Sequence, residues 1–226
     1  MTYILGARCK DGVVLVADRK VTYEDGHIEW QDKLFGDHTS IIFGGAGAIG
    51  FIQHFRDRLK RYYSEKSEGL IDDFVFQMEK NVGDINKLYN YTQRDFEVLV
   101  GIKTFVGEKN ISVLQYIAPA GIAENVTRYK VIGSGEPYGS ILMNIQWRED
   151  MSMLETAKLG YFIISVIIKL HLTDWVGVEE GRHPNIWFIP DNNDIFPADN
   201  RLLTEIATET QRKLETLKAN IKNVFS

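Results

Sequence analysis

The order of apolar runs and turn residues predicts how the chain begins. Residues 3–9 and 13–17 are rich in β-forming side chains, and the turn tripeptide Lys10-Asp11-Gly12 separates them. This pattern predicts an antiparallel hairpin. Residues 13–17 are apolar at every position, which is typical of a strand that is covered on both faces.

Helices and a second group of strands follow. Apolar residues recur every three or four positions in two segments and predict amphipathic helices at residues 48–63 and 71–88. Turn residues divide the next apolar segments into strands, which we expect to form a meander. The later predicted elements are strands at 96–103, at 111–118 and ending at 131–132, a helix at 153–172, a strand at 185–189 and a helix at 200–224.

Two groups of antiparallel strands that alternate with pairs of helices indicate an α+β protein. The arrangement expected is a four-layer α-β-β-α sandwich, with two antiparallel sheets packed face to face and helices on the outer faces. The sequence contains no internal repeat and no Pro-rich linker. Residues 1–226 are therefore expected to form a single domain.

Composition and charge narrow the classes of function. The chain has 26 Lys+Arg against 31 Asp+Glu, a net charge of −5, which argues against nucleic acid as a partner. The mostly apolar segment at residues 161–168 is short, whereas a membrane-spanning helix needs about 20 such residues. The single cysteine, Cys9, excludes an internal disulfide and indicates the cytoplasm.

A nucleotide site and a metal site are alternatives that the sequence raises. Gly45-Ala46-Gly47-Ala48-Ile49-Gly50 is a literal G-x-G-x-x-G after a predicted strand. A dinucleotide fold requires a parallel strand after the helix, but polar residues 64–69 and a second helix follow here. The five histidines are scattered, and His171 with Asp174 forms only a two-ligand fragment. Neither a cofactor nor a metal is expected.

Several short motifs together resemble a mature proteasome β subunit. Thr2, Gly6 and the run from Cys9 to Lys20 resemble its start, and the likeness continues through Lys33-Leu34-Phe35, Ala46-Gly47 and Gly133-Ser134-Gly135. The likeness extends over the whole chain and is dense in the first fifty residues and around these patches. The resemblance implies the fold of the N-terminal nucleophile hydrolases, a family of enzymes whose first residue attacks the substrate.

The chemistry of such a site can be argued for Thr2, Lys33 and Asp18. Once Met1 is removed, Thr2 supplies a hydroxyl nucleophile and an α-amine whose pKa of about 7.7–8.0 suits a base. Lys33 would favour the alkoxide and keep the amine neutral, and Asp18 would keep Lys33 ionised. Activity is therefore expected to rise through neutral pH and to decline in acid.

The resemblance implies further roles. Gly47, between a strand and a helix, would offer its N–H to the oxyanion, while Ser134 and Asp174 would orient the Thr2 amine. The family usually has a serine three residues after that aspartate, but this chain has Gly177. The specificity pocket would lie beside Lys20, Val21 and Gly45. Because Gly45 has no side chain, the pocket is expected to accept a large residue on the acyl side of the cleaved bond.

The sequence thus predicts a threonine-type peptidase that cuts peptide bonds of peptide or protein substrates through an acyl-enzyme. The alternatives are a non-catalytic scaffold subunit, which Gly177 favours, and a dedicated amidase or transpeptidase on the same fold. The resemblance also implies homo-oligomeric rings, with other proteasome-like subunits or an ATP-dependent unfoldase as further partners. No membrane partner is expected.

Overall fold

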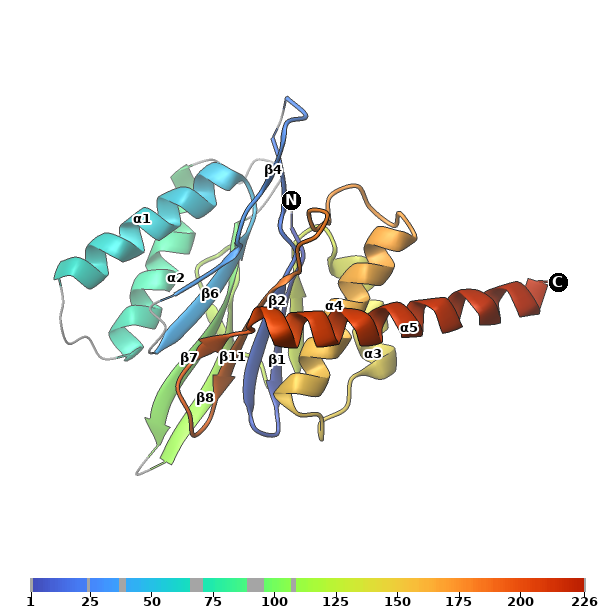
Figure 1. Ribbon diagram of the computed structural model, residues 1–226. Helices are drawn as coiled ribbons and strands as arrows, with labels where there is room; N and C mark the ends of the chain where they lie inside the picture. Colours follow the sequence, from blue (N-terminus) through green and yellow to red (C-terminus); the bar gives the residue numbers. More distant parts are fainter. Residues whose placement is uncertain are drawn as a thin grey trace.

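Two five-stranded antiparallel sheets form the centre of the fold, and helices cover their outer faces (Figure 1). The computed structural model describes residues 2–23, 25–36, 40–65, 71–88, 96–106 and 109–225. The arrangement confirms the α+β four-layer sandwich that the sequence predicts. Met1, whose removal the predicted chemistry requires, lies outside the described residues.

The first sheet is built on the predicted hairpin, in which Ala7 lies opposite Val14. Every residue of the second hairpin strand is buried, because one face packs on the other sheet and the opposite face on helices. The uninterrupted apolar run at residues 13–17 is explained by this double covering. The strand order is β10 (Tyr129–Ile132), β1 (Ile4–Cys9), β2 (Gly12–Ala17), β11 (Asn185–Pro190) and β12 (Phe196–Pro197).

The second sheet has the order β5 (Leu34–Gly36), β6 (Ile41–Ala46), β7 (Glu97–Val106), β8 (Lys109–Ile117) and β9 (Ala123–Asn125). The predicted meander is correct for β7 and β8 but wrong for the stretch that ends at Ile132. That stretch is β10, and it pairs with β1 in the first sheet. Val131 belongs to the core between the first sheet and its helices, and Ile132 belongs to the core between the two sheets. Only a strand of the first sheet contacts both of these cores.

Five helices within the described residues form the two outer layers. They are α1 (Ile49–Glu65) and α2 (Ile71–Leu88) on the second sheet, and α3 (Glu136–Gln146), α4 (Met153–Lys169) and α5 (Asn200–Phe225) on the first. Four agree with the predicted helices, whereas α3 was not predicted. None of these helices is both long enough and apolar enough to cross a bilayer.

Three hydrophobic cores separate the four layers. Leu15 and Leu99 belong to the core between the sheets. Phe55 of α1 packs on Phe43 and its neighbours in the second outer core, and Ile163 of α4 belongs to the first outer core. A short hairpin of β3 (Lys20–Thr22) and β4 (Ile28–Trp30) continues beyond β2 and lies beside the N-terminus (Figure 1).

Candidate active site

Thr2 lies two residues before the start of β1 and is almost completely buried, with 2% of its surface exposed. A tight turn at residues 133–135 holds it. Thr2 N lies 3.1 Å from the Ser134 hydroxyl oxygen, and Gly135 N donates to the Thr2 carbonyl at 3.2 Å. Gly133 has a φ of +89°, and a Cβ there would lie 2.4 Å from the Thr2 carbonyl oxygen. Only glycine therefore allows this turn to approach Thr2 so closely.

Asp18 and Lys33 form a buried ion pair, with Lys33 Nζ 2.6 Å from Asp18 Oδ1. Asp18 follows β2 and Lys33 precedes β5, so the pair joins the ends of the two sheets. Three backbone N–H groups also donate to the Asp18 carboxylate: those of Tyr3 at 2.8 Å, and of Lys20 and Gly177 at 3.1 Å each. The negative charge is thus fully solvated by the protein.

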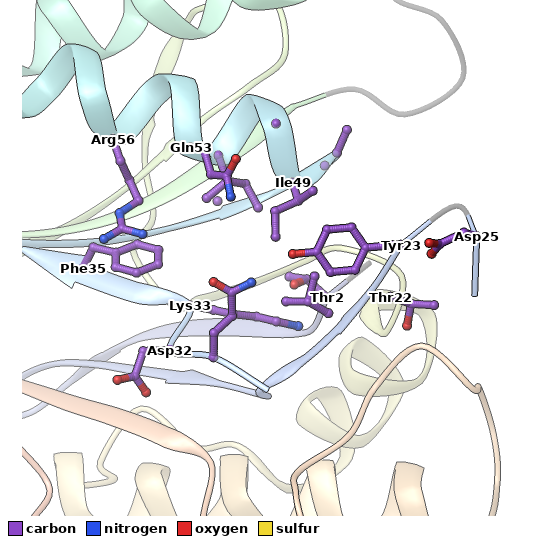
Figure 2. Close-up of a pocket in the computed structure, with 17 residues that line it drawn as sticks. Thr2, Thr22, Tyr23, Asp25, Asp32, Lys33, Phe35, Ile49, Gln53 and Arg56 are labelled. Carbon is purple, nitrogen blue, oxygen red and sulfur yellow. The ribbon is translucent and has the colours of Figure 1, made fainter. Parts of the chain in front are cut away.

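Burial and the neighbouring carboxylate act in opposite directions on Lys33. Burial lowers the pKa of the Lys33 ammonium, and the adjacent Asp18 carboxylate opposes this effect. The net direction is downward, so the ammonium loses its proton at a lower pH than that of an exposed lysine does. Figure 2 shows the Lys33 side chain extending toward Thr2. The structure therefore brings Thr2, Asp18 and Lys33 together.

Gly47 lies in the connection between β6 and α1, as predicted. Its φ of +143° is one that side chains rarely adopt, and a Cβ at this position would lie 3.2 Å from Phe96 Cα. The dense packing fixes the backbone beside Thr2, and both residues line the same cavity. In this position Gly47 can present a backbone N–H to a bound carbonyl oxygen.

A cavity of about 470 Å³ opens next to Thr2 (Figure 2). Val21 and Gly45 line it, as predicted, but Lys20 does not. The Lys20 ammonium instead donates to the carbonyl oxygen of Asp174 at 2.7 Å. The volume is that of a site for a side chain or small ligand, for which about 300–1,000 Å³ is usual.

The structure separates the two residues expected to orient the Thr2 amine. Ser134 contacts Thr2 N, whereas Asp174 is exposed, and its carboxylate makes no hydrogen bond or ion pair within the described part of the chain. Gly177 contributes through its backbone N–H to Asp18. A Cβ there would lie 3.0 Å from Lys20 Cδ and 3.3 Å from Trp30 Cη2, so close packing accounts for the glycine.

Sequence reasoning missed most of the cavity wall. Phe35 and Arg56 form one end, with the guanidinium carbon 3.8 Å from the ring centroid. Ile49, Gln53 and Arg56 all come from α1, and Figure 2 shows them above Thr2 and Lys33. Successive members of this set are four and three positions apart, which places all three on one face of the helix. This spacing is visible in the sequence.

Neither alternative site finds support in the architecture. The strand of the G-x-G-x-x-G segment, β6, pairs antiparallel with β5 and β7, so the parallel crossover of a dinucleotide fold is missing. Gly45 and Gly47 instead make room for Phe96. Within the described ranges, no group of three His, Cys, Asp or Glu side chains is arranged to hold a metal ion.

Comparison with known proteins identifies the family. Residues 2–176 match the sequence model that describes proteasome subunits. The chain belongs to the proteasome subunit family. Its fold is accordingly that of a proteasome-like N-terminal nucleophile hydrolase, as the resemblance implied.

Sequence relatives in this family include both types of proteasome subunit. The chain is 29% identical over 166 residues to "Proteasome subunit alpha" of Methanocaldococcus jannaschii, covering 70% of this chain and 61% of that protein. It thus spans about three fifths of the relative's length. It is also 23% identical over 230 residues to "Proteasome subunit beta 2" of Pyrococcus abyssi, covering 98% of this chain and 95% of that one.

Solved structures with the same fold include proteasome-related Anbu proteins. Anbu, an ancestral β subunit, from Yersinia bercovieri aligns with a TM-score of 0.75 at 16% identity, over 96% of both chains. The helical assembly of the Anbu complex from Pseudomonas aeruginosa gives a TM-score of 0.73 at 15% identity, again over 96% of both chains. At these identities the likeness concerns the fold.

Proposed function

We propose that this chain is an N-terminal threonine hydrolase that cleaves peptide or related amide bonds through an acyl-enzyme ester. The observation that carries the proposal is the buried Lys33–Asp18 pair, 2.6 Å across, because Lys33 lines the same cavity as Thr2. Fold alone does not fix function. A nucleophile, a basic group and an open cavity in one place are what acyl transfer requires.

The reaction follows from the groups around Thr2. After removal of Met1, the Thr2 amine accepts the hydroxyl proton while the oxygen attacks the substrate carbonyl carbon. The N–H of Gly47 stabilises the oxyanion, and the Lys33 charge favours the alkoxide. The tetrahedral intermediate then breaks its C–N bond, and the Thr2 ammonium gives its proton to the departing amine. Water, deprotonated by the same amine, hydrolyses the remaining ester and restores Thr2.

The amine is oriented by Ser134 in this proposal, with Asp174 as an expected second partner. Their placement supports unequal roles: the Ser134 hydroxyl lies 3.1 Å from Thr2 N, whereas the Asp174 side chain is exposed. An amine held by one hydroxyl keeps more rotational freedom than one held by two groups, which slows proton transfer. We therefore expect slow turnover.

The cavity indicates the substrate residue on the acyl side of the cleaved bond. Val21 and Gly45, which line the cavity, are proposed to contact it, and Lys20 is proposed to support Val21, its neighbour in β3. The volume of about 470 Å³ accommodates a large side chain. Arg56 faces this space, stacked on Phe35, and pairs with no acidic side chain in the described parts of the chain. Its charge favours a substrate side chain that ends in a carboxylate.

Acylation of Thr2 tests the proposal. Protein whose Met1 has been removed, as verified by intact mass, is incubated with a β-lactone, an electrophile that acylates N-terminal threonine. A single mass increase is expected for the wild type, with a rate that rises through neutral pH as the amine loses its proton. Thr2→Ala and Lys33→Ala should show none. Thr156→Ala is the matched control, because Thr156 is equally buried but bonds to Cys9. Labelling that persists in Thr2→Ala refutes the proposal.

A scaffold subunit without catalysis is the second candidate. The likeness to proteins named proteasome subunit alpha favours it, as does the glycine at position 177. The same experiment separates the two, because a scaffold leaves Thr2 unmodified at every pH. A dedicated amidase or transpeptidase would be acylated and would then transfer the acyl group to water or to an added amine.

Partners follow from the family. Proteasome-like subunits form oligomeric assemblies, and we propose a homo-oligomeric ring for this chain, joined by other proteasome-like subunits or an ATP-dependent unfoldase. Peptides or proteins are the proposed substrates. Cys9 is buried and free, which suits a reducing cytoplasm.

A further inference from the structure

Glu97 is a half-buried carboxylate that joins the two sheets beneath the site. It is the first residue of β7 and lies opposite Ala46 of β6. Gly133 N donates to its Oε1 at 3.1 Å, and the Tyr116 hydroxyl donates to its Oε2 at 2.7 Å. Gly133 follows β10 of the first sheet, so this side chain connects the first sheet to the second.

The turn that Glu97 holds is the turn that holds Thr2. Gly135 N donates to the Thr2 carbonyl, and the Ser134 hydroxyl also donates to this carbonyl, at 3.3 Å. The Cα of Gly133 lies so close that an added Cβ would be 2.4 Å from the same oxygen. With this contact distance, any displacement of the turn changes the position of Thr2.

The residue before Glu97 fixes the other half of the site. Phe96 packs directly against Gly45 and Gly47. The buried Asn86 side chain clamps it, accepting from Phe96 N and donating to Phe96 O, both at 2.8 Å. Phe96 and Glu97 are thus adjacent residues that support the Gly47 backbone and the 133–135 turn, respectively.

We propose that Glu97 is a positioning residue that sets Thr2 in register with Gly47 by anchoring the 133–135 turn to β7. The inference rests on the proposed function, because register between nucleophile and oxyanion donor matters only if acyl transfer takes place. A displacement of about 1 Å in such a pair costs on the order of a hundredfold in rate. Glu97 touches neither substrate nor nucleophile and acts through the turn.

Burial and hydrogen-bond donors act in opposite directions on the Glu97 carboxylate. Burial raises the pKa of Glu97 and Glu136 of α3 adds to the effect, while the donors Tyr116 and Gly133, and Lys130 of β10, oppose it. Two donors, one in β8 and one in the turn after β10, converge on its two oxygens, and a glutamate can accept both. A glutamine of the same shape can accept from Gly133 and donate to Tyr116, so it preserves the anchor.

The variants Glu97→Ala and Glu97→Gln test the inference. The control is Glu79→Ala, because the Glu79 carboxylate also accepts one backbone N–H, that of Ala123 at 2.7 Å, and does not line the cavity. For Glu97→Ala we expect β-lactone acylation of Thr2 to slow about tenfold in its maximal rate, with half-saturation unchanged. Glu97→Gln should restore the rate to within about threefold of the wild type, and Glu79→Ala should leave it unchanged.

Hydrogen exchange of residues 129–136 provides a readout that is independent of chemistry. Exchange in this segment should be faster in Glu97→Ala and close to wild type in Glu97→Gln. Unchanged exchange in Glu97→Ala, or equal slowing of acylation in Glu79→Ala, overturns the inference. If the wild type is never acylated, the proposed hydrolase function fails, and exchange alone decides whether Glu97 anchors the turn. Should Glu97→Ala not fold, Tyr116→Phe removes one of the two donors and is expected to speed exchange to a smaller degree.

Discussion

Removing either member of the Lys33–Asp18 pair should abolish acylation of Thr2, but the two changes should differ in their cost to stability. Lys33→Met leaves Asp18 with its three backbone donors, those of Tyr3, Lys20 and Gly177. Breaking a buried pair costs about 3–5 kcal/mol when one charge is left without compensation. Because three N–H groups still compensate Asp18, we expect a loss near the lower limit, about 3 kcal/mol.

Asp18→Ala leaves all three N–H groups without an acceptor. At about 1–3 kcal/mol for each unsatisfied group, the sum is about 3–9 kcal/mol. The loss of Asp18 as a partner of Lys33 adds little, because burial already lowers the pKa of the Lys33 ammonium and the ammonium can lose its proton. Since a domain of this kind is stable by only about 5–15 kcal/mol, Asp18→Ala should lose most of its stability. Asp18→Asn, which keeps one acceptor oxygen, should fall between the two.

Equilibrium unfolding in urea, followed by tryptophan fluorescence, measures the three free energies. All variants must be compared at one protein concentration and in one oligomeric state, because subunit association shifts apparent stability. The expected order of destabilisation is Lys33→Met, then Asp18→Asn, then Asp18→Ala. If Lys33→Met proves as destabilised as Asp18→Ala, the backbone donors are not what stabilises the buried charge, and the reasoning is wrong.

Two further predictions concern the turn and the cavity. Gly133→Ala should abolish acylation of Thr2, because the new Cβ would lie 2.4 Å from the Thr2 carbonyl oxygen. The control Gly26→Ala, at a φ of +84° with nothing within 4 Å, should lose only about 1–2 kcal/mol of stability through backbone strain and keep full activity. Equal activity of the two variants would contradict this account. In a panel of fluorogenic peptides, the wild type should prefer large residues that end in a carboxylate on the acyl side of the cleaved bond. Arg56→Gln should reduce that preference about fivefold. Cleavage after small residues only would refute the pocket assignment.

The sequence pattern predicted the long helices and strands of this fold well and the short ones poorly. Residues 13–17 could be recognised as a doubly covered strand because no polar position interrupts them. Helix α3 was missed because Pro137 and Gly139 disrupt the usual signal, although proline suits a first turn and Gly139 allows Tyr3 to pack against the helix. The β3–β4 hairpin has three residues in each strand, too few to show an alternation.

The hydrophobic pattern of a strand does not show which other strand it pairs with. Strand β10 has an ordinary strand pattern, and its membership in the first sheet depends on the outer and inner cores that Val131 and Ile132 fill. The same limit applies to the site. Thr2, Asp18 and Lys33 came from a family resemblance, whereas Glu97 and Arg56 act through neighbours far away in sequence, Gly133 and Phe35, which a local motif does not reveal.

The concentration of buried charge around Thr2 bears on the choice between enzyme and scaffold. Asp18 and Lys33 are almost completely removed from solvent, at 0% and 4% exposure, and Glu97 is half-buried. A buried ion pair is often no more stabilising than apolar side chains of the same volume, so a chain that served only as a scaffold would gain nothing from this arrangement. A nucleophile beside an oxyanion donor does gain, because fixed charges in a dry site need no reorganisation during the reaction. The energetic cost of these groups therefore favours the proposed hydrolase over a scaffold. A variant that lacks all three charges and is still acylated at the wild-type rate would reverse that conclusion.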